Sequence, residues 1–423
     1  MHTVFACDIW TASQRWLQNL GVQPILGDMN TRIWDGAAKQ ITTKDMHGKA
    51  LKISTRDEEI DLYVCGFMCT PFTPNGKRKE WADEHSRTFF SAVKTISALK
   101  PRVAILENVM AISNNSNAKI VKKTLAKLTG YVICYLKSNS LDHGIPQHRP
   151  RMYMVAIRKE GALKSIFEGR AQEVLERFLQ RKIGRCQQPC QVNFREWLAD
   201  MGHPIKVNMM SERSDEVDEE QCTCTRLAAV CILHPCKCNE CSHHGEKALQ
   251  CKWRHRHRLH RKNANCIKKR RKYLLAWRKV KKDNCLKSVP DYFALARKRG
   301  LDTQLVSQRS RRDLLSIYSQ ESNIMRDTCI LNLSKSLGRV SLRSDGFVPT
   351  LGHGCSGFFV PSAAAYLDLH QLMCLTGFDP SAHKKVFEVI TEHSESDLDI
   401  MIGNAMCLPL VGAVAACALS MIE

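Results

Sequence analysis

Cys69 is the residue whose setting most directly suggests chemistry. It stands in the run Gly66-Phe67-Met68-Cys69-Thr70-Pro71-Phe72-Thr73, directly after the apolar residues 62–65. A strand that leads into such a loop holds its last side chains at the mouth of a sheet, where open α/β sheets place their chemistry. A thiolate there can act as a nucleophile. Because most cysteines outside disulfides are inert core residues, the interpretation needs support from further residues.

That support comes from charged residues beside other apolar runs. Asp8, Asp28 and Glu107 each follow a short apolar run, and Arg149 and Arg151 precede another. The carboxyl ends of parallel strands meet in one crevice of the sheet. We therefore expect the three acids and the cysteine to line a shared site.

The elements that would position these residues follow an alternating pattern. Residues 1–160 alternate short apolar strands with helical patterns, which predicts an α/β fold with a mostly parallel, doubly wound sheet. Strands are expected at residues 3–7, 22–27, 62–66, 103–106, 131–136 and 152–157. Helices are expected at residues 12–20, 86–99 and 118–128. The apolar residues 406–422 contain Pro409 and are a little short for a membrane span, so they predict a buried terminal helix.

The composition favours a polyanionic partner. The 423 residues carry a formal net charge of +21, which suits nucleic acid or an anionic membrane surface. No basic-then-apolar leader opens the chain, so the 20 cysteines are expected as thiols, metal ligands or a nucleophile in a reducing compartment. Three parts are predicted: a first domain at 1–160, an insertion at 161–345, and a segment at 346–423 that closes back on the first domain.

The insertion carries a cysteine- and histidine-rich stretch, residues 222–251, followed by a strongly basic one, residues 252–282. Cys236, Cys238, Cys241 and Cys251 could close a tetrahedral zinc site, although no second well-spaced pair completes a familiar pattern. The alternative is a basic insertion with reduced thiols. The basic run 268–272 fits a nuclear import signal and fits a nucleic-acid contact equally well.

Four ordered motifs resemble those of the cytosine-5 DNA methyltransferase family. Cys69 lies in a Gly-x-x-Cys-x-x-Phe-Thr loop, and Glu107 opens a Glu-Asn-Val motif. Arg149 and Arg151 belong to a Gln-x-Arg-x-Arg motif, and Asn404 to a Gly-Asn motif before the apolar terminal helix. Weaker matches are Asp8, the Gly-Asp-Met run at 27–29, and the segment 372–379. The resemblance covers residues 1–160 and about 340–423.

The resemblance implies a Rossmann-like methyltransferase that uses S-adenosylmethionine and acts on DNA. With the basic run 268–272 as an import signal, we expect the protein in the nucleus. Cys69 would add to carbon 6 of cytosine, and Glu107 would hold and protonate ring nitrogen 3. Arg149 and Arg151 would hold the base carbonyl and orient these two groups. The insertion would be the target-recognition region, with its basic run on phosphates.

The cofactor is expected beside four other residues. Asp8 would hold the ribose, Asp28 and Met29 would lie near the adenine, and Asn404 would complete the site. From the residues alone, Asp8 and Asp28 could instead form turns or caps, and Asn404 could cap the final helix.

Three departures from the family pattern leave rivals open. The chain begins at what resembles the second strand, without the Gly-rich loop, so we expect a fragment or a relative that has lost cofactor binding. Met68 and Thr70 replace the Pro and Gln that flank the family nucleophile. Phe72 and Thr73 also fit the branch that methylates tRNA. The alternatives are therefore a tRNA cytosine-5 methyltransferase and an inactive nucleic-acid-binding module.

Overall fold

The computed structural model describes residues 2–56, 59–73, 80–205, 326–335, 340–352, 355–363 and 365–423, with residues 272, 275, 314 and 317. The chain divides into two units. The first comprises Met1–His203, Phe347–Cys355 and Asp368–Glu423, and the second Pro204–Gly346 and Ser356–Leu367. The stretch predicted to bind zinc lies outside the described residues. Within them, no group of three or more His, Cys, Asp or Glu side chains could hold a metal ion.

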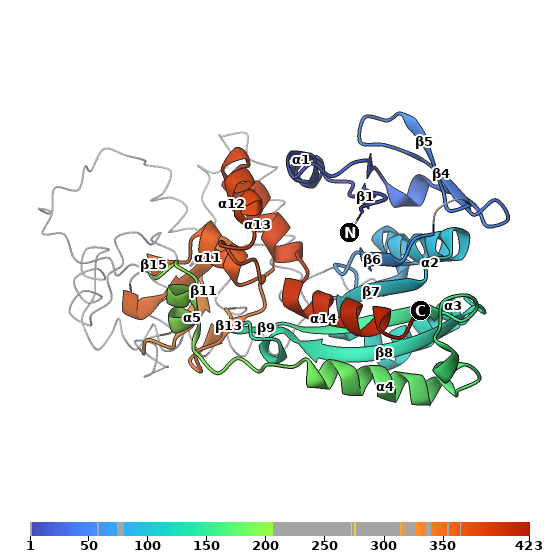
Figure 1. Ribbon diagram of the computed structural model, residues 1–423. Coiled ribbons are helices and arrows are strands. Elements are labelled where there is room, and N and C mark those ends of the chain that lie inside the picture. Colours follow the sequence, from blue (N-terminus) through green and yellow to red (C-terminus); the bar gives the residue numbers. More distant parts are fainter. Residues whose placement is uncertain are drawn as a thin grey trace, which may run out of the picture. The chain divides into compact units, whose positions relative to one another are not determined.

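The first unit is built on a four-stranded sheet in the order β6-β7-β10-β8 (Figure 1). Its strands are β6 (Leu62–Gly66), β7 (Val103–Val109), β8 (Tyr131–Asn139) and β10 (Pro150–Arg158). β6 runs parallel to β7, whereas β10 lies antiparallel between β7 and β8. The predicted mostly parallel sheet is therefore corrected to a mixed one. The link from β8 to β10 is too short for a helical crossover, so β10 returns antiparallel.

Two smaller sheets belong to the same unit. β1 (Ala6–Cys7) pairs in parallel with β2 (Ile25–Leu26), and the helix α1 (Thr11–Asn19) joins them. The strands β3 (Ile33–Asp35), β4 (Gln40–Lys44) and β5 (Ala50–Ser54) form an antiparallel sheet that the sequence analysis missed. Alternating burial along β4, with Ile41 fully buried, shows that one face of this sheet packs inward.

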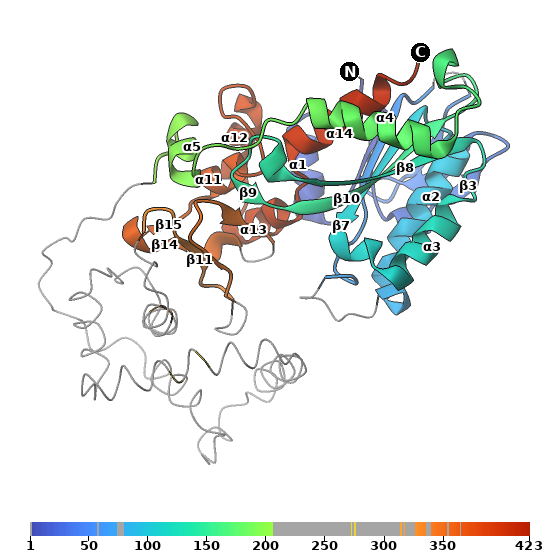
Figure 2. The same ribbon diagram turned by 90° about the horizontal axis from the view of Figure 1, so that it is seen from below.

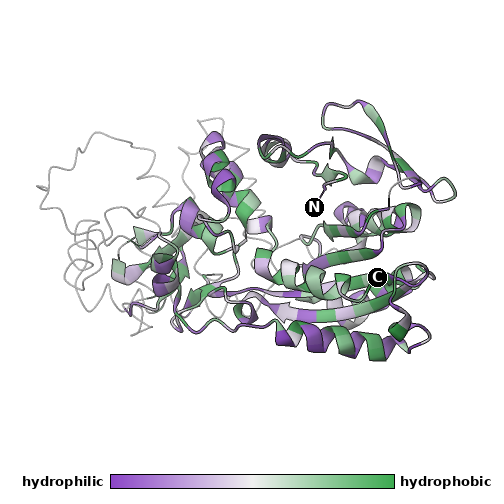
Figure 3. Cartoon of the chain, in the orientation of Figure 1, coloured by the Kyte–Doolittle hydropathy of each residue, from purple (hydrophilic) through white to green (hydrophobic). Residues whose placement is uncertain are grey.

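Helices cover both faces of the central sheet (Figures 1 and 2). α2 (Arg87–Leu99) and α3 (Asn115–Leu125) lie on one face, and α4 (Gln172–Arg185) and α14 (Leu408–Leu419) on the other. Each face has its own apolar core, one around Phe89, Ile96 and Leu106 and the other around Ile105, Leu179 and Leu410. Figure 3 shows apolar residues concentrated along the strands and α14.

The C-terminal segment returns to the first unit as four helices. They are α11 (Leu369–Cys374), α12 (Lys384–Val389), α13 (Glu395–Asn404) and α14. Gly377 has φ +96°, and a Cβ there would lie 2.2 Å from Pro409 Cδ, so glycine permits this close approach. α5 (Phe194–Asp200) and a short parallel pair, β9 (Gln147–His148) with β13 (Val348–Pro349), complete the unit.

Residues Glu395–Leu419 are long and apolar enough to cross a membrane by length and composition alone. They form two helices, because Ala405 has an extended backbone and Cys407 precedes the first turn of α14. Leu410 and Val414 are fully buried in the core beside the sheet. The predicted terminal helix is present, and its inner face packs as a core helix.

The second unit contains an antiparallel sheet among its described residues. Its order is β12-β11-β14-β15. The strands are β11 (Ile330–Asn332), β12 (Leu342–Arg343), β14 (Phe358–Val360) and β15 (Ala365–Tyr366). Residues 161–203, which the sequence analysis groups with the insertion, lie in the first unit with α4 and α5.

Candidate active site

The register between β7 and β10 brings a buried carboxyl group, that of Glu107, next to a buried guanidinium group, that of Arg151. Arg151 lies opposite Val109, two residues beyond Glu107, so the charged side chains are diagonal neighbours on one face of the sheet. Arg151 Nε lies 2.9 Å from Glu107 Oε1, and each residue is 8% exposed. Strand β7 continues to Val109, three residues beyond its predicted end at 106, so Glu107 stands within the strand.

The second carboxylate oxygen of Glu107 faces a narrow space over β6. Gly66 is its register partner, and a Cβ on Gly66 would lie 3.5 Å from Glu107 Oε2 and 3.7 Å from Met406 Sδ. A methyl group at position 66 would lie in ordinary van der Waals contact with both groups. Burial raises the pKa of Glu107, while the Arg151 and Arg149 guanidinium groups act to lower it. The carboxyl therefore holds a proton more readily than an exposed glutamate does.

The loop of Cys69 is fixed from the neighbouring strand. Asn108, fully buried, donates from Nδ2 to the carbonyl oxygen of Phe67 at 2.9 Å. The carbonyl oxygen of Cys69 accepts from the backbone N–H groups of Phe72 and Thr73, at 2.9 and 3.1 Å. Met68, which replaces the family proline, is 39% exposed. The thiol is thus carried on a turn anchored at Phe67.

The charges of Arg151 and Arg149, which lower the pKa of Glu107, also lower the pKa of the Cys69 thiol. Burial raises its pKa, Arg151 acts most strongly to lower it, Glu107 raises it and Arg149 lowers it. The four predicted catalytic residues therefore form one electrostatic cluster. A low dielectric makes these couplings stronger than they would be in water.

Arg149 donates its side-chain hydrogen bonds to backbone carbonyl groups of the C-terminal segment. Its Nη1 donates to the carbonyl oxygen of Leu351 at 2.7 Å, and its Nη2 to that of Ala405 at 2.5 Å, with Gly403 O at 3.4 Å. Burial and, next, the charge of Arg151 lower its pKa to about 10. The guanidinium ties β9 and β10 to the C-terminal segment, which makes Arg149 a positioning residue.

Gln147, in the same motif, also bonds to the backbone of the C-terminal segment, which sequence reasoning missed. Fully buried, it donates from Nε2 to the carbonyl oxygen of Leu375 at 2.8 Å. The backbone N–H of Leu408 donates to the carbonyl oxygen of Thr376 at 2.9 Å. These bonds hold the C-terminal segment over the face of the sheet that carries Glu107. Only the motif itself signalled Gln147 and Asn108, without their partners.

The predicted cofactor residues lie at the ends of β1 and β2. Asp8 Oδ1 accepts from the Trp10 backbone N–H at 2.8 Å, and burial raises the Asp8 pKa. Asp28 Oδ1 accepts from the Asn30 N–H at 2.8 Å and caps a short 3₁₀ helix. Both carboxylates serve local turns, as the alternative interpretation allowed. Met29 packs partly buried against the core that contains Phe67.

Asn404 ends α13 and is exposed. It does not cap the final helix, because the residue before the first turn of α14 is Cys407, which makes no side-chain capping bond. Its backbone neighbours Gly403 and Ala405 both accept from Arg149. The backbone on both sides of Asn404 is therefore bonded to the Arg149 guanidinium group.

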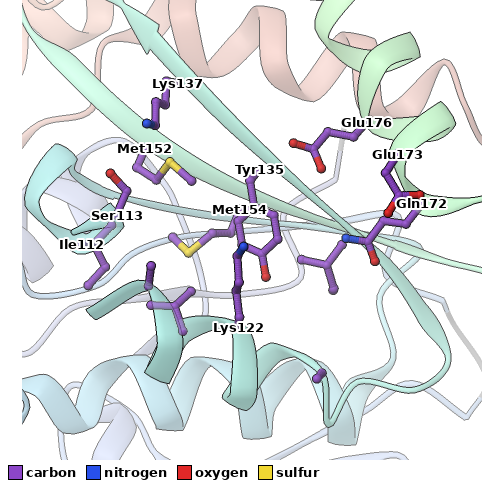
Figure 4. A pocket seen from close by; sticks show the side chains of 14 residues that line it. Ile112, Ser113, Lys122, Tyr135, Lys137, Met152, Met154, Gln172, Glu173 and Glu176 are labelled. Carbon is purple, nitrogen blue, oxygen red and sulfur yellow. The ribbon is translucent and has the colours of Figure 1, made fainter. Parts of the chain in front are cut away.

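A cavity of about 530 Å³ lies on the other face of the sheet (Figure 4). Met152 and Met154 line it, and strand alternation directs them away from the face that carries Arg151 and Glu107. Figure 4 shows Lys122 and Glu176 at its walls. This cavity is separate from the charged cluster.

An α/β domain with a cysteine on a strand-end loop and a buried carboxyl–guanidinium pair fits a methyl-transferring enzyme class. Residues 30–227 match the sequence profile of C-5 cytosine-specific DNA methylase. This region of the chain is similar to that family. It contains Cys69, Glu107, Arg149 and Arg151, whereas all four predicted cofactor residues, Asp8, Asp28, Met29 and Asn404, lie outside the matched range.

Individual relatives agree over shorter stretches. The type II methyltransferase M.HaeII of Haemophilus aegyptius is 37% identical over 98 residues, 22% of this chain and 30% of its own length. M.HhaI of Haemophilus parahaemolyticus is 34% identical over 103 residues, 24% of this chain and 31% of its own. This chain thus spans less than a third of the length of either relative. The solved S. pombe Dnmt2 methyltransferase shows 21% identity and a TM-score of 0.26, covering 37% of this chain and 43% of its own.

Proposed function

We propose that this protein transfers a methyl group from S-adenosylmethionine to carbon 5 of cytosine in DNA, through a covalent cysteine adduct. One observation carries the proposal: Arg151 holds Glu107 at 2.9 Å beside the thiol loop that Asn108 anchors. A nucleophile, a carboxyl with a raised pKa and a cation are the groups that this reaction needs. The family match over residues 30–227 supports the same activity.

Each residue has a definite task in this scheme. The Cys69 sulfur adds to carbon 6 of the base, which makes carbon 5 nucleophilic. Glu107 holds ring nitrogen 3 and donates a proton as negative charge develops there. Arg151 keeps the carboxyl in place and lowers the pKa of the thiol. Arg149 acts at a distance by fixing the C-terminal segment over the pair.

The nucleoside half of the cofactor suits the ends of β1 and β2. The half-buried carboxylate of Asp8, which bonds to Ser13 as well as to the Trp10 and Ile9 backbone, is an acceptor of the kind that a ribose diol requires. Asp28 and Met29 offer an acceptor and an apolar side chain for the adenine. When bound, S-adenosylmethionine supplies the electrophilic methyl group. Asn404 is proposed to complete this site.

The target base must leave the duplex stack to reach Cys69. We propose that the insertion 161–345 is the target-recognition region, and that its basic run 252–282 contacts phosphates. Zinc on Cys236, Cys238, Cys241 and Cys251, and nuclear import through residues 268–272, stay predictions. Metal analysis of the purified chain, and imaging of a fluorescent fusion with and without that basic run, would test them.

The test is methyl transfer from labelled S-adenosylmethionine to duplex DNA and to tRNA. Wild type should label DNA, Cys69→Ser should not, and Cys190→Ser should behave as wild type. Cys190 is a matched control because, like Cys69, it is a half-buried free thiol. Label on tRNA alone would replace DNA as the substrate. Binding of DNA without label on either substrate would leave a nucleic-acid-binding module.

A further inference from the structure

A second pair of sulfur atoms lies outside the candidate active site. Cys186 directly follows α4 as its C-cap residue, Cys417 belongs to α14, and their Sγ atoms are 3.7 Å apart. Cys186 is exposed, whereas Cys417 is 4% exposed. The two residues are 231 positions apart in the sequence, so only the packing of the two helices brings them together.

The packing around the pair fixes this approach. Lys182, one turn before Cys186, donates from Nζ to Ser420 Oγ at 2.8 Å. Since Ser420 follows Cys417 by three residues, the two contacts show that α4 and α14 run antiparallel. Leu179 and Val414, both fully buried, pack in the core between these helices and the sheet. The sulfurs therefore meet at a defined register.

We propose that Cys186 and Cys417 form a reversible dithiol–disulfide site that responds to a peroxide or a small disulfide. A disulfide needs sulfur atoms about 2.05 Å apart, so the pair must close by roughly 1.7 Å. Cys186 is the C-cap residue that directly follows α4. A small adjustment there leaves the buried side of the helix in place.

The oxidation balances in two steps. The Cys186 thiol attacks a peroxide oxygen, the O–O bond breaks, and a sulfenic acid and water form. The Cys417 sulfur then attacks the Cys186 sulfur, the S–O bond breaks and a second water leaves. The two thiols lose two electrons and two hydrogens to the peroxide. With a small disulfide as oxidant, two exchange steps release two small thiols instead.

Exposure sets the order of these steps. An oxidant reaches Cys186 first because Cys417 is buried beneath it. Burial and the neighbouring Cys186 sulfur raise the Cys417 pKa to about 11, while Lys182 opposes this. Cys190 lies four residues after Cys186, and its thiol donates to the carbonyl oxygen of Val192 at 3.4 Å. It is therefore the matched control cysteine for Cys186.

The experiment treats the reduced full chain with hydrogen peroxide or glutathione disulfide and maps its peptides without reductant. We expect one cross-linked peptide joining Cys186 to Cys417, lost on adding dithiothreitol. The midpoint of thermal unfolding should rise by about 5 °C on oxidation, because the bond closes a long loop. Cys186→Ser should abolish both effects, and Cys190→Ser should retain both.

Two results would overturn the proposal. One is a mixed disulfide or sulfinic acid on Cys186 with Cys417 still free, since the buried thiol would then be unable to resolve the adduct. The other is cross-linking of Cys186 to any other cysteine in preference to Cys417. Cys186→Ser changes an exposed side chain, so its folding is expected to match wild type, and circular dichroism checks that.

Discussion

The ends of β6 and β7 and the ends of β1 and β2 hold their polar groups in different ways. At β7, Asn108 reaches Phe67, 41 residues earlier, and the motif that follows reaches residues more than 200 positions later through Arg149. At β1 and β2, Asp8 and Asp28 bond to backbone groups only two residues further on. The side chains of the first region are therefore held by distant partners, whereas the two carboxylates of the second are held by local turns.

This difference bears on which groups are ready for chemistry. A buried group held by distant partners keeps one geometry, because several elements must move before it can. A carboxylate in a local turn keeps its bond whether or not the rest of the unit is assembled. We therefore expect substitutions at the β7 end to affect catalysis and global stability, and those at the β1 and β2 ends to act locally.

The largest effect is expected for Glu107→Gln. The amide keeps the shape of the carboxyl but cannot donate a proton to the base, so kcat should fall by about 10²- to 10⁴-fold. Single-turnover methyl transfer to duplex DNA measures this. Glu176→Gln is the matched control, since burial raises the pKa of Glu176 as well but that residue lines the separate cavity. Activity of Glu107→Gln within threefold of wild type would remove the acid from the scheme.

Arg149→Met should mainly reduce stability. It leaves the carbonyl groups of Leu351 and Ala405 unpaired in a buried setting, which costs about 3 kcal/mol of unfolding free energy. Urea unfolding measures the loss. Arg343→Met, which removes a surface partner of Asp345, should stay within about 1 kcal/mol. A loss at Arg149 no larger than that of the surface control would show that the guanidinium holds nothing together.

Sequence patterns located the local elements well. The strand at residues 62–66 and the helix at 86–99 match β6 and α2 to within one residue. Apolar periodicity and turn residues report such elements because both are properties of neighbouring residues. The grouping of Cys69 with Glu107 also followed from local rules, since parallel strand ends share an edge.

What the sequence could not supply depends on distant partners. The antiparallel return of β10 follows from the short link after β8, and the alternating burial of β4 becomes visible only in the folded unit. Nothing local indicates that Arg149 bonds to carbonyl groups near positions 351 and 405, so a motif match gave it a role on the substrate. The two arginines of one motif thus have separate tasks, Arg151 on Glu107 and Arg149 on the backbone.

A matched pair of alanine substitutions sharpens the contrast. Asn108→Ala leaves the buried carbonyl of Phe67 unpaired and should cost about 1–3 kcal/mol. Asp28→Ala removes a cap from a three-residue 3₁₀ helix and should cost about 0.5–1 kcal/mol. Global unfolding free energies from urea titration compare the two directly. An equal or larger loss for Asp28→Ala would contradict the division into globally and locally held regions.

The finest effect is a shift in the reactivity of Cys69 with pH. Iodoacetamide reacts with the thiolate, so the rate follows deprotonation. Burial raises the Cys69 pKa above its ordinary value of 9.0, and the charges of Arg151 and Glu107 pull it in opposite directions. Arg151→Gln removes the lowering charge and should move the alkylation midpoint to higher pH. Glu107→Gln removes a raising charge and should move it to lower pH.

Peptide mapping after timed alkylation separates Cys69 from a thiol close to it. Cys65 has a pKa raised to about 11, chiefly by burial, and Arg151 is not among the groups that shift it. Arg151→Gln should therefore slow Cys69 and leave Cys65 unchanged. If Arg151→Gln and Glu107→Gln shift the Cys69 midpoint in the same direction, the substitutions loosen the loop rather than change its electrostatics. Opposite shifts would show that Glu107 and Arg151 act on the thiol through their charges.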